Sequence, residues 1–341
     1  MNLEKEREEV FSYKTLLQVL TKKLKKQIVE ATYKVDKLYG GTVGDVYLVT
    51  GVATSINHVN EEYKVVLKKQ NKWERYGDVN SWRREYDLYA SSLSQTFPDD
   101  FSWPECYETT FTSNAFDLWM EYVDAPSGNH LTLEMYQKAA EALGMFQGKV
   151  YLDKPDEINK INNFSSEDYV KAFYYHYRSW NEVYDYVRSS DCDLSKDVCQ
   201  MLIDLDSNHK EVFELLDHLP VVMCHRDYWN TNIFYLKDKI VVIDWDTAGY
   251  GYFGEDIASL VADETDPDKM VEYFKTCVVA YVRGFSQYVD IKVNAFKVVY
   301  YIILLMFGYR LVESYKFASD ESEKALAKQS LQSIFDMQNY I

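Results

Sequence analysis

The spacing of apolar residues changes along the chain, and each change marks a different kind of secondary structure. Over roughly the first thirty residues, Val10, Leu16, Leu17 and Leu20 recur among charged residues, which predicts an amphipathic helix. The stretches YKVDKLYGGTVGDVYLVTGV and EEYKVVLKKQ then alternate or run β-branched, with glycine at the bend. This second pattern predicts three antiparallel strands.

Helical spacing returns in NSWRREYDLYASSL, and NAFDLWMEYV is again strand-like. A cluster of turn residues, DAPSGN at 124–129, follows. Beyond it helical patterns dominate, in LTLEMYQKAAEALGMFQGKVY, in SSEDYVKAFYYHYRSWNEVYDYV, at 194–217 and from about 267 to the end. Two short apolar runs, PVVMCH and KIVVIDW, interrupt them as predicted strands, with YLKDK as the bend between the two. The order of elements predicts an α+β fold in which a strand-rich lobe precedes a helix-rich lobe.

Composition limits the classes of partner. The net charge is −17, from 54 acidic and 37 basic residues, which argues against nucleic acid or an anionic membrane as the main partner. The same charge mildly favours a cationic ligand, although an acidic surface more commonly serves solubility. Apolar residues make up 47% of the chain, enough for a packed core.

Cysteine usage and the hydrophobic runs indicate the compartment. The five cysteines are scattered, odd in number and without a C-x-x-C pair, so we expect neither a disulfide framework nor a zinc site. The charged N-terminus has no apolar signal core. The most apolar run, 296–309, contains Lys297 and stops at Arg310, so a buried helix explains it better than a membrane span. We therefore expect a soluble, cytoplasmic protein.

A glycine-rich stretch, YGGTVGDVY, lies between two predicted strands. Glycine lets backbone N–H groups approach phosphate oxygens closely because no Cβ intervenes. A glycine-rich hairpin turn is the commoner reason for such a sequence. Alone, this stretch is therefore weak support for phosphate binding.

A lysine near the end of the third predicted strand, in VVLKK, is a candidate for an inward position. A buried amine costs free energy unless an anion and a carboxylate meet it, and Glu85 on the following helix is a candidate carboxylate. Strand alternation places Lys68 and Lys69 on opposite faces. We expect Lys68 to point inward, with Lys69 as the alternative. Taken alone, two solvated lysines at a strand end are the simpler explanation.

The strongest polar cluster comprises Asp227 and Asn232, in VMCHRDYWNTN, and Asp244, which follows the next apolar run. Carboxylate and amide oxygens at strand ends suit Mg²⁺, a hard cation that keeps several waters and bridges phosphates. A further carboxylate beside such a metal can orient a hydroxyl and accept its proton. Asp227 is thus a candidate base, a candidate metal ligand or a residue of a well-bonded turn.

The motif HRDYWNTN followed by VVIDWD resembles the catalytic and metal motifs of the protein-kinase-like fold. The short form H-x-D-x-x-x-x-N … I-D-W-D/E … G-x-x-x-D-x-A is similar to that of the aminoglycoside phosphotransferase and choline kinase superfamily. The resemblance covers residues from about 30 to 260. It implies a protein-kinase-like two-lobe fold, with a nucleotide-binding lobe at 1–123 and a helical lobe at 124–341 that carries the catalytic loop and the acceptor site.

The resemblance also implies roles for residues of the second lobe. Asp227 would be the catalytic base or would orient the hydroxyl, and Asn232 and Asp244 would bind Mg²⁺. His225 would position the loop around Asp227. Asp256 would anchor the catalytic region through backbone hydrogen bonds, although an ordinary acidic residue at a helix N-terminus is nearly as good an explanation.

In the first lobe the resemblance implies a site for ATP or GTP. Lys68 would contact the α- and β-phosphates and pair with Glu85. The stretch WMEYV is similar to the kinase hinge, so the carbonyl of Glu121 and the N–H of Val123 would hold the base. The loop over the phosphates would consist of Gly41, Thr42 and Gly44.

Departures from the motifs narrow the class of kinase. Tyr39 stands where protein kinases have their first glycine, small-molecule members often have Asn at the position of Gly44, and Arg226 stands where they usually have Gly. Only eleven residues separate Asp244 from Asp256, and no A-P-E follows. A protein kinase needs room there for an activation segment, so a small-molecule acceptor is expected.

Two features bear on the acceptor. Segment 255–268 holds six acids that could attract an amine, although a solvated face is the commoner explanation. These acids are Glu255, Asp256, Asp263, Glu264, Asp266 and Asp268. The aromatic-rich stretch YVKAFYYHYRSWNEVYDYV could stack on a sugar or enclose a cation, although core packing explains most such patterns. Trp229 could line the acceptor site.

These observations predict an ATP- or GTP-dependent, Mg²⁺-requiring O-phosphotransferase for a small hydroxylated, amine-bearing molecule. Aminoglycoside-like sugars come first, and choline- or ethanolamine-type amino alcohols second. A catalytically silent kinase-like binding protein, like spore-coat relatives, is the alternative; the joint presence of Lys68, Glu85, Asp227, Asn232 and Asp244 argues against it. Protein kinase activity is a weaker third option. The sequence leaves the oligomeric state open.

Overall fold

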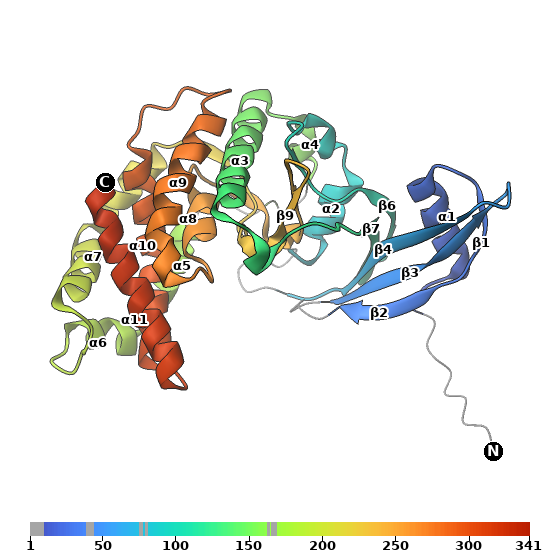
Figure 1. Ribbon diagram of the computed structural model, residues 1–341. Helices are drawn as coiled ribbons and strands as arrows, with labels where there is room; N and C mark the ends of the chain where they lie inside the picture. The colour runs from blue at the N-terminus through green and yellow to red at the C-terminus, as the bar shows by residue number, and fades with distance from the viewer. Residues whose placement is uncertain (1–9, 39–43, 75–77, 79–80, 162–163, 165–168) are drawn as a thin grey trace, which may run out of the picture. The chain divides into compact units, whose positions relative to one another are not determined.

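The computed structural model describes residues 10–38, 44–74, 78, 81–161, 164 and 169–341. The chain forms two compact units, Met1–Ala90 with Pro104–Asp124, and Ser91–Trp103 with Ala125–Ile341 (Figure 1). The α+β class expected from the sequence is confirmed. The sequence predicted a boundary between residues 123 and 124, whereas the first unit ends one residue later, at Asp124. The prediction also placed Ser91–Trp103 in the first lobe, but this segment packs with the second unit.

The aromatic residues of Ser91–Trp103 explain why this segment packs with the second unit. Strand β5 (Phe101–Ser102) pairs in parallel with β10 (Lys239–Val242). The ring of Phe101 stacks on that of Phe146, with ring centroids 4.3 Å apart, and Trp103 packs edge-on against Trp245. Burial of these large rings stabilises the segment on the second unit.

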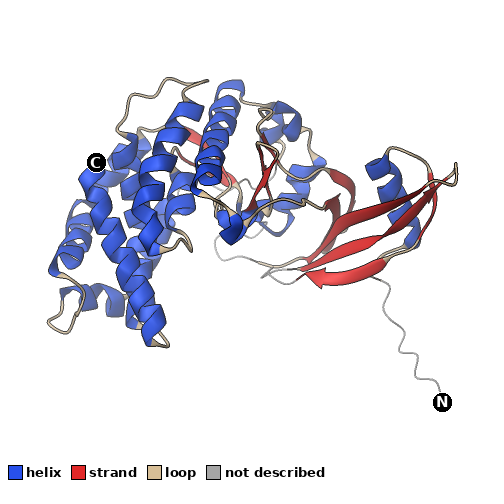
Figure 2. Ribbon diagram, viewed as in Figure 1, coloured by secondary structure: helices blue, strands red, loops and turns tan. Residues whose placement is uncertain are grey.

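The described residues of the first unit form a six-stranded antiparallel sheet, drawn in red in Figure 2. Its strands run in the order β1-β3-β4-β7-β6, with β2 beside β3. Their bounds are β1 (Ile28–Ala31), β2 (Lys34–Leu38), β3 (Asp45–Ser55), β4 (Asn60–Asn71), β6 (Cys106–Phe111) and β7 (Ala115–Glu121). The three antiparallel strands predicted from residue 33 onward are β2, β3 and β4, and the extra strand β1 lies at the end of the stretch that was expected to be helical.

The N-terminal helix α1 (Tyr13–Leu24) supplies the core on one face of this sheet. Its buried Leu16, Val19 and Leu20 cluster with Val65 and Leu67 of β4. Because successive strand residues point to opposite faces, Lys68 projects from the face that α1 does not cover. Helix α2 (Arg84–Ala90), which carries Glu85, follows a short 3₁₀ turn.

Helices dominate the second unit. They are α3 (Leu133–Asp153), α4 (Asp156–Asn159), α5 (Tyr169–Arg178), α6 (Asn181–Arg188), α7 (Lys196–Asp217), α8 (Glu255–Ala262), α9 (Pro267–Phe285), α10 (Ala295–Lys316) and α11 (Glu321–Asp336). The single helix expected across 165–187 is broken between α5 and α6, where Trp180 is extended and its ring stacks on Phe317.

Helices α3 and α9 pack against each other, side by side in Figure 1. A Cβ at Gly144 would lie 2.2 Å from the carbonyl oxygen of Tyr281, and one at Gly284 would lie 2.1 Å from that of Glu141. Real atoms do not approach so closely, so both positions require glycine. The two backbones therefore meet at a distance that no side chain would allow.

Helix α10 is longer than the apolar run that predicts it. It spans 22 residues and, by length and composition alone, could cross a membrane. Its most apolar window is 72% buried inside the protein, and a buried core helix passes the same test. Burial on all sides agrees with the expectation of a core helix.

Short strands position the polar motifs. Strand β8 (Val221–Cys224) pairs with β11 (Gly249–Tyr252), and β9 (Ile233–Leu236) pairs with β10. The bend YLKDK thus joins β9 to β10, not β8 to β10 as expected, because the catalytic motif occupies the chain between β8 and β9.

Candidate active site

The lysine site, which we define as Lys68 and Glu85, lies in the first unit. Lys68 Nζ lies 2.5 Å from Glu85 Oε2, and both side chains are almost fully buried. Lys69 points to the other face and pairs with Asp117 at 2.8 Å, where it remains about one-third exposed. The structure thus gives Lys68, not Lys69, the inward position and the predicted carboxylate partner.

The glycine-rich stretch is described only in part, since Gly41 and Thr42 lie outside the described residues. Gly44 has φ +83°, and a Cβ there would lie 2.7 Å from the carbonyl oxygen of Lys69. Both facts require glycine for backbone reasons. Its place over nucleotide phosphates remains a prediction.

The predicted hinge residues lie at the end of β7. The N–H of Glu121 donates to the carbonyl oxygen of Glu105 at 2.8 Å, which ties this end of the strand to the chain before β6. Val123, two residues further, is buried. Their predicted bonds to a nucleotide base remain predictions.

The catalytic-loop cluster, which we define as Asp227, Asn232 and Asp244, lies in the second unit. The amide Nδ2 of Asn232 donates to Oδ2 of Asp227 at 2.8 Å and to its carbonyl oxygen at 2.9 Å. Burial and the nearby charge of Asp244 raise the pKa of Asp227 to about 6. The three residues predicted from separate motifs therefore share one locality.

The donor set of this cluster fits Mg²⁺. Because both hydrogen bonds of the Asn232 amide group use its nitrogen, its Oδ1 is left to act as a ligand. Asp244 has φ 65° and ψ 63°, a left-handed backbone that costs free energy in a non-glycine residue and is typical of functional sites. Among described residues, no group of three His, Cys, Asp or Glu could hold a metal. The carboxylate of Asp244 and the amide oxygen of Asn232 suit an ion that keeps waters and bridges phosphates.

His225 holds the loop in place from within. Its Nε2 donates to the carbonyl oxygen of Ile243 at 2.9 Å, and its Nδ1 accepts from the N–H of Asp227 at 3.3 Å. Its own carbonyl oxygen accepts from the hydroxyl of Thr247 at 2.8 Å. The ring therefore joins the chain before Asp227 to the chain before Asp244.

Asp256 supports the same loop from α8. Its carboxylate accepts from the N–H groups of His225 and Arg226, both at 2.8 Å, and from Nε2 of Gln147 at 2.9 Å. Full burial raises the pKa of Asp256 to about 7, although these hydrogen bonds oppose the shift. Gln147 in turn accepts from the hydroxyl of Tyr281 at 2.6 Å. No motif indicated Gln147, and its only signal is a polar residue on the apolar stripe of α3.

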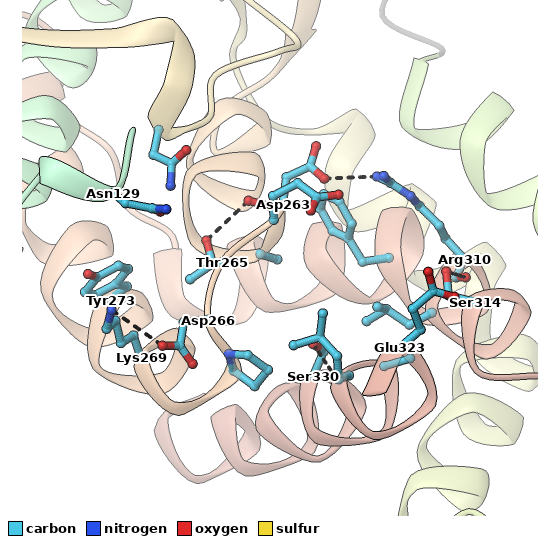
Figure 3. A pocket seen from close by; sticks show the side chains of 18 of the residues that line it. Asn129, Asp263, Thr265, Asp266, Lys269, Tyr273, Arg310, Ser314, Glu323 and Ser330 are labelled. Carbon is cyan, nitrogen blue, oxygen red and sulfur yellow. Dashed lines mark hydrogen bonds and ion pairs between the residues drawn. The ribbon is translucent and has the colours of Figure 1, made fainter. Parts of the chain in front are cut away.

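A cavity of about 960 Å³, which we call the acidic cavity, opens beside the catalytic loop (Figure 3). Asn230 of the loop lines it, together with residues of α9, α10 and α11. Its carboxylates are Asp263, Glu264, Asp266, Glu313 and Glu323. Three of the six acids expected to face an acceptor are therefore among the lining residues.

The other expected acceptor features lie elsewhere. Glu255 and Asp256 are buried and used internally, and Asp268 and Trp229 are not among the lining residues. The aromatic stretch of α5 and α6 does not line the cavity either. It contributes indirectly, since Trp180 stacks on Phe317, which does.

Residues 118–285 match the model of the phosphotransferase enzyme family. This match covers the end of β7 and the part of the second unit that holds the catalytic-loop cluster, and it agrees with the resemblance to the aminoglycoside phosphotransferase and choline kinase superfamily. The matched family is one of phosphotransferase enzymes, which supports the predicted enzyme class. No curated protein matches the sequence significantly.

Solved structures of small-molecule kinases share the fold of this chain at low sequence identity, which confirms the predicted kinase-like fold. Choline kinase from Cryptosporidium parvum Iowa II is 14% identical with a TM-score of 0.54, over 90% of this chain and 89% of that one. Aminoglycoside phosphotransferase from Alicyclobacillus acidocaldarius is 14% identical with a TM-score of 0.55, over 99% and 97%. Amicoumacin kinase, solved with AMP-PNP and Ca²⁺, is 13% identical with a TM-score of 0.54, over 96% and 94%.

The departure from the superfamily pattern at Arg226 has a structural explanation. Arg226 has φ 67°, a backbone conformation that favours glycine. Its buried guanidinium pairs with Glu255 at 3.1 Å, donates to the carbonyl oxygen of Tyr250 and lies over the ring of Tyr169. These bonds offset the backbone strain, so the chain keeps a glycine-type turn with an arginine in it.

Proposed function

We propose that this protein transfers the γ-phosphoryl group of ATP or GTP to a hydroxyl of a small, amine-bearing molecule, in a reaction that requires Mg²⁺. One observation carries the proposal. The catalytic-loop cluster, held by His225 and Asp256, adjoins a cavity whose charged lining residues are five carboxylates and two cations. A base, a cation-binding oxygen set and an electronegative cavity thus occur in one unit.

Asp227 is the residue we assign to the acceptor hydroxyl. Its carboxylate would accept the hydroxyl proton as the oxygen attacks phosphorus, and its hydrogen bond from Asn232 fixes its orientation. A pKa raised to about 6 lies close to neutrality, where a general base is most effective. Positioning supplies most of the acceleration in phosphoryl transfer.

Oδ1 of Asn232 and the carboxylate of Asp244 are the ligands we assign to Mg²⁺. When bound, the ion neutralises charge on the phosphate oxygens. In the first unit, the buried amine of Lys68, held by Glu85, is assigned to the α- and β-phosphates. Gly41, Thr42 and Gly44 are assigned to the loop over the phosphates, and Glu121 and Val123 to the base. The fold relative amicoumacin kinase was solved with AMP-PNP, which supports nucleotide use.

The charges of the acidic cavity support an acceptor that carries amines. Its two cationic side chains are both paired: Arg310 with Asp263 at 3.1 Å and Lys269 with Asp266 at 3.5 Å (Figure 3). Glu264 and Glu313 also line the cavity and add negative charge beyond these pairs. An ammonium group would therefore meet a net negative lining.

The size of the acidic cavity favours a larger acceptor. A volume of about 960 Å³ is at the upper end of the range for drug-sized ligands and far exceeds what a single amino alcohol fills. Phe317 lines the cavity, is 47% exposed and stacks on Trp180, which gives a flat apolar surface for a sugar ring. We therefore place aminoglycoside-like sugars before choline-type amino alcohols.

The proposal is tested in two steps on the full chain. First, thermal unfolding is measured with ATP or GTP, each with and without Mg²⁺; we expect a Mg²⁺-dependent rise in the melting temperature. Second, release of nucleoside diphosphate is measured with a panel of aminoglycosides and amino alcohols. Nucleotide stabilisation without turnover on any acceptor would support the silent binding protein instead. No stabilisation by either nucleotide would contradict the proposal.

A further inference from the structure

Two thiols of the second unit lie in contact. Cys192 follows α6, Cys199 lies in the first turn of α7, and their Sγ atoms are 3.5 Å apart. Both residues are partly exposed, whereas Cys224 and Cys277 are buried. Cys106, also partly exposed, belongs to the first unit. Cys192 and Cys199, which we call the thiol pair, are thus both adjacent and accessible to small reagents.

Local bonds hold the backbone on either side of the thiol pair. The N–H of Cys192 donates to the carbonyl oxygen of Ser189 at 3.4 Å, and Ser195 caps α7 by accepting from the N–H of Val198 at 3.2 Å. Between them, Asp193 accepts from the hydroxyl of Tyr186 at 2.7 Å. A disulfide needs its sulfurs at about 2.05 Å. The bond therefore requires the two sulfurs to approach each other by about 1.5 Å.

We propose that the thiol pair is a redox site that forms a reversible intramolecular disulfide with a low-molecular-weight disulfide as oxidant. The thiolate of one cysteine attacks a sulfur of the small disulfide, which gives a mixed disulfide and releases one thiolate. The thiolate of the other cysteine attacks the protein-bound sulfur, closes the Cys192–Cys199 bond and releases the second thiolate. The protein loses two electrons and two protons, and the small disulfide becomes two thiols.

The two cysteines have different roles in this sequence. Burial and the neighbouring sulfur raise the pKa of Cys199 to about 12, which leaves little thiolate at neutral pH. We therefore assign the first attack to Cys192. Cys199 is the resolving thiol, because it already lies in contact with the sulfur that it must attack.

The thiol pair is compatible with the expectation that the protein has no disulfide framework. Spacing of seven residues is no known redox motif, so only the fold brings these sulfurs together. In a reducing compartment the pair rests as two thiols and is oxidised only under oxidative load. This places the bond among labile disulfides, not among those of a structural framework.

The test uses the full-length native chain, fully reduced and then exposed to oxidised glutathione. Remaining thiols are alkylated, and the protein is digested with trypsin without reduction. Because Lys196 lies between the two cysteines, cleavage there separates them. We expect peptides 189–196 and 197–210 to remain joined, and to separate after reduction.

Three comparisons decide the outcome. Cys106→Ser should leave the cross-link unchanged, and Cys199→Ser should leave glutathione attached at Cys192. The cross-link should also form faster in the native chain than in chain unfolded in urea, because the fold holds the sulfurs in contact. A stable glutathione adduct at Cys192 in the unaltered native chain would overturn the proposal. So would a cross-link that forms no faster in the native chain than in the unfolded one.

Discussion

The lysine site and the catalytic-loop cluster differ in how many elements hold them. Lys68 and Glu85 join one strand to one helix through a buried ion pair. The catalytic loop is held by hydrogen bonds to α3, α8 and the chain after β10. Charge compensation in a buried ion pair is therefore central to the first site, whereas the second site depends on a network of hydrogen bonds.

This difference predicts how each site responds to a substitution. Removal of one partner from a buried ion pair leaves an uncompensated charge, which is costly at once. Removal of one bond from a network leaves other bonds to hold the backbone. We thus expect stability to report most strongly on the lysine site, and reaction rate on the catalytic-loop cluster.

The largest effect is expected for Asp227→Asn. The amide keeps the side-chain shape and can still accept from Asn232, but it cannot take a proton. We expect the turnover rate to fall by about 10²–10⁴-fold, while nucleotide binding by thermal shift persists. Asp238→Asn, at the exposed β9–β10 turn, is the matched control and should retain full turnover. Nearly unchanged turnover in Asp227→Asn would refute the base assignment.

Lys68→Ala should cause the largest loss of stability. It removes the Lys68 amine from the carboxylate of Glu85, which is only 1% exposed, at a cost of about 3–5 kcal/mol. Lys69→Ala removes a partly exposed pair with Asp117 and should cost about 0–1 kcal/mol. Urea unfolding of both variants measures the difference. Equal losses of unfolding free energy in the two variants would mean that the buried Lys68–Glu85 pair stabilises the protein no more than the partly exposed Lys69–Asp117 pair does.

Asp256→Asn tests the network through pH. The pKa of Asp256 is raised to about 7, so the folded chain binds this proton more tightly than the unfolded chain. The free energy of unfolding should then fall as pH rises from about 4 to about 7, and the variant should lack that part of the slope. Urea unfolding at both ends of this range measures it. A stability difference that grows with pH would mean that Asp256 is held as an anion by its three N–H donors.

The smallest effect is expected for Phe317→Ala, which removes the aromatic ring that forms the flat apolar surface of the acidic cavity. For a ring-bearing acceptor, we expect KM to rise by about 3–10-fold, the size of one aromatic contact, with kcat unchanged. A short amino alcohol should show no change. Tyr340→Ala, another part-exposed aromatic outside the cavity lining, is the control. An equal change for both acceptors would mean that Phe317 shapes the cavity as a whole.

Local patterns were enough to predict the fold class and to choose between the two lysines. Strand alternation gave Lys68 the inward position because alternation is a property of the strand itself. The pairing of β8 with β11, and of β5 with β10, could not be predicted, since each joins segments distant in sequence. Short strands carry too little pattern to specify their partners.

The supporting residues of the site were harder to predict than its polar cluster. Gln147 lies in an unremarkable helical stripe, and its bond to Asp256 joins residues 109 positions apart. Arg226 looked like a departure from the pattern, and only its φ of 67° shows that the turn is preserved. The Gln147 hydrogen bond and the contacts of Arg226 join residues far apart in the sequence, so local sequence patterns do not predict them.

The glycine contact between α3 and α9 sets a length as well as a packing arrangement. Gln147 follows Gly144 by one turn, and Tyr281 precedes Gly284 by one, so the spacing of the two helices fixes the span that their hydrogen bond must bridge. That bond continues to Asp256 and from there to the backbone before Asp227. The spacing of the two helices thus determines the position of the catalytic loop. A methyl group added at Gly144 would therefore change the orientation of Asp227, although the two residues are far apart in the sequence.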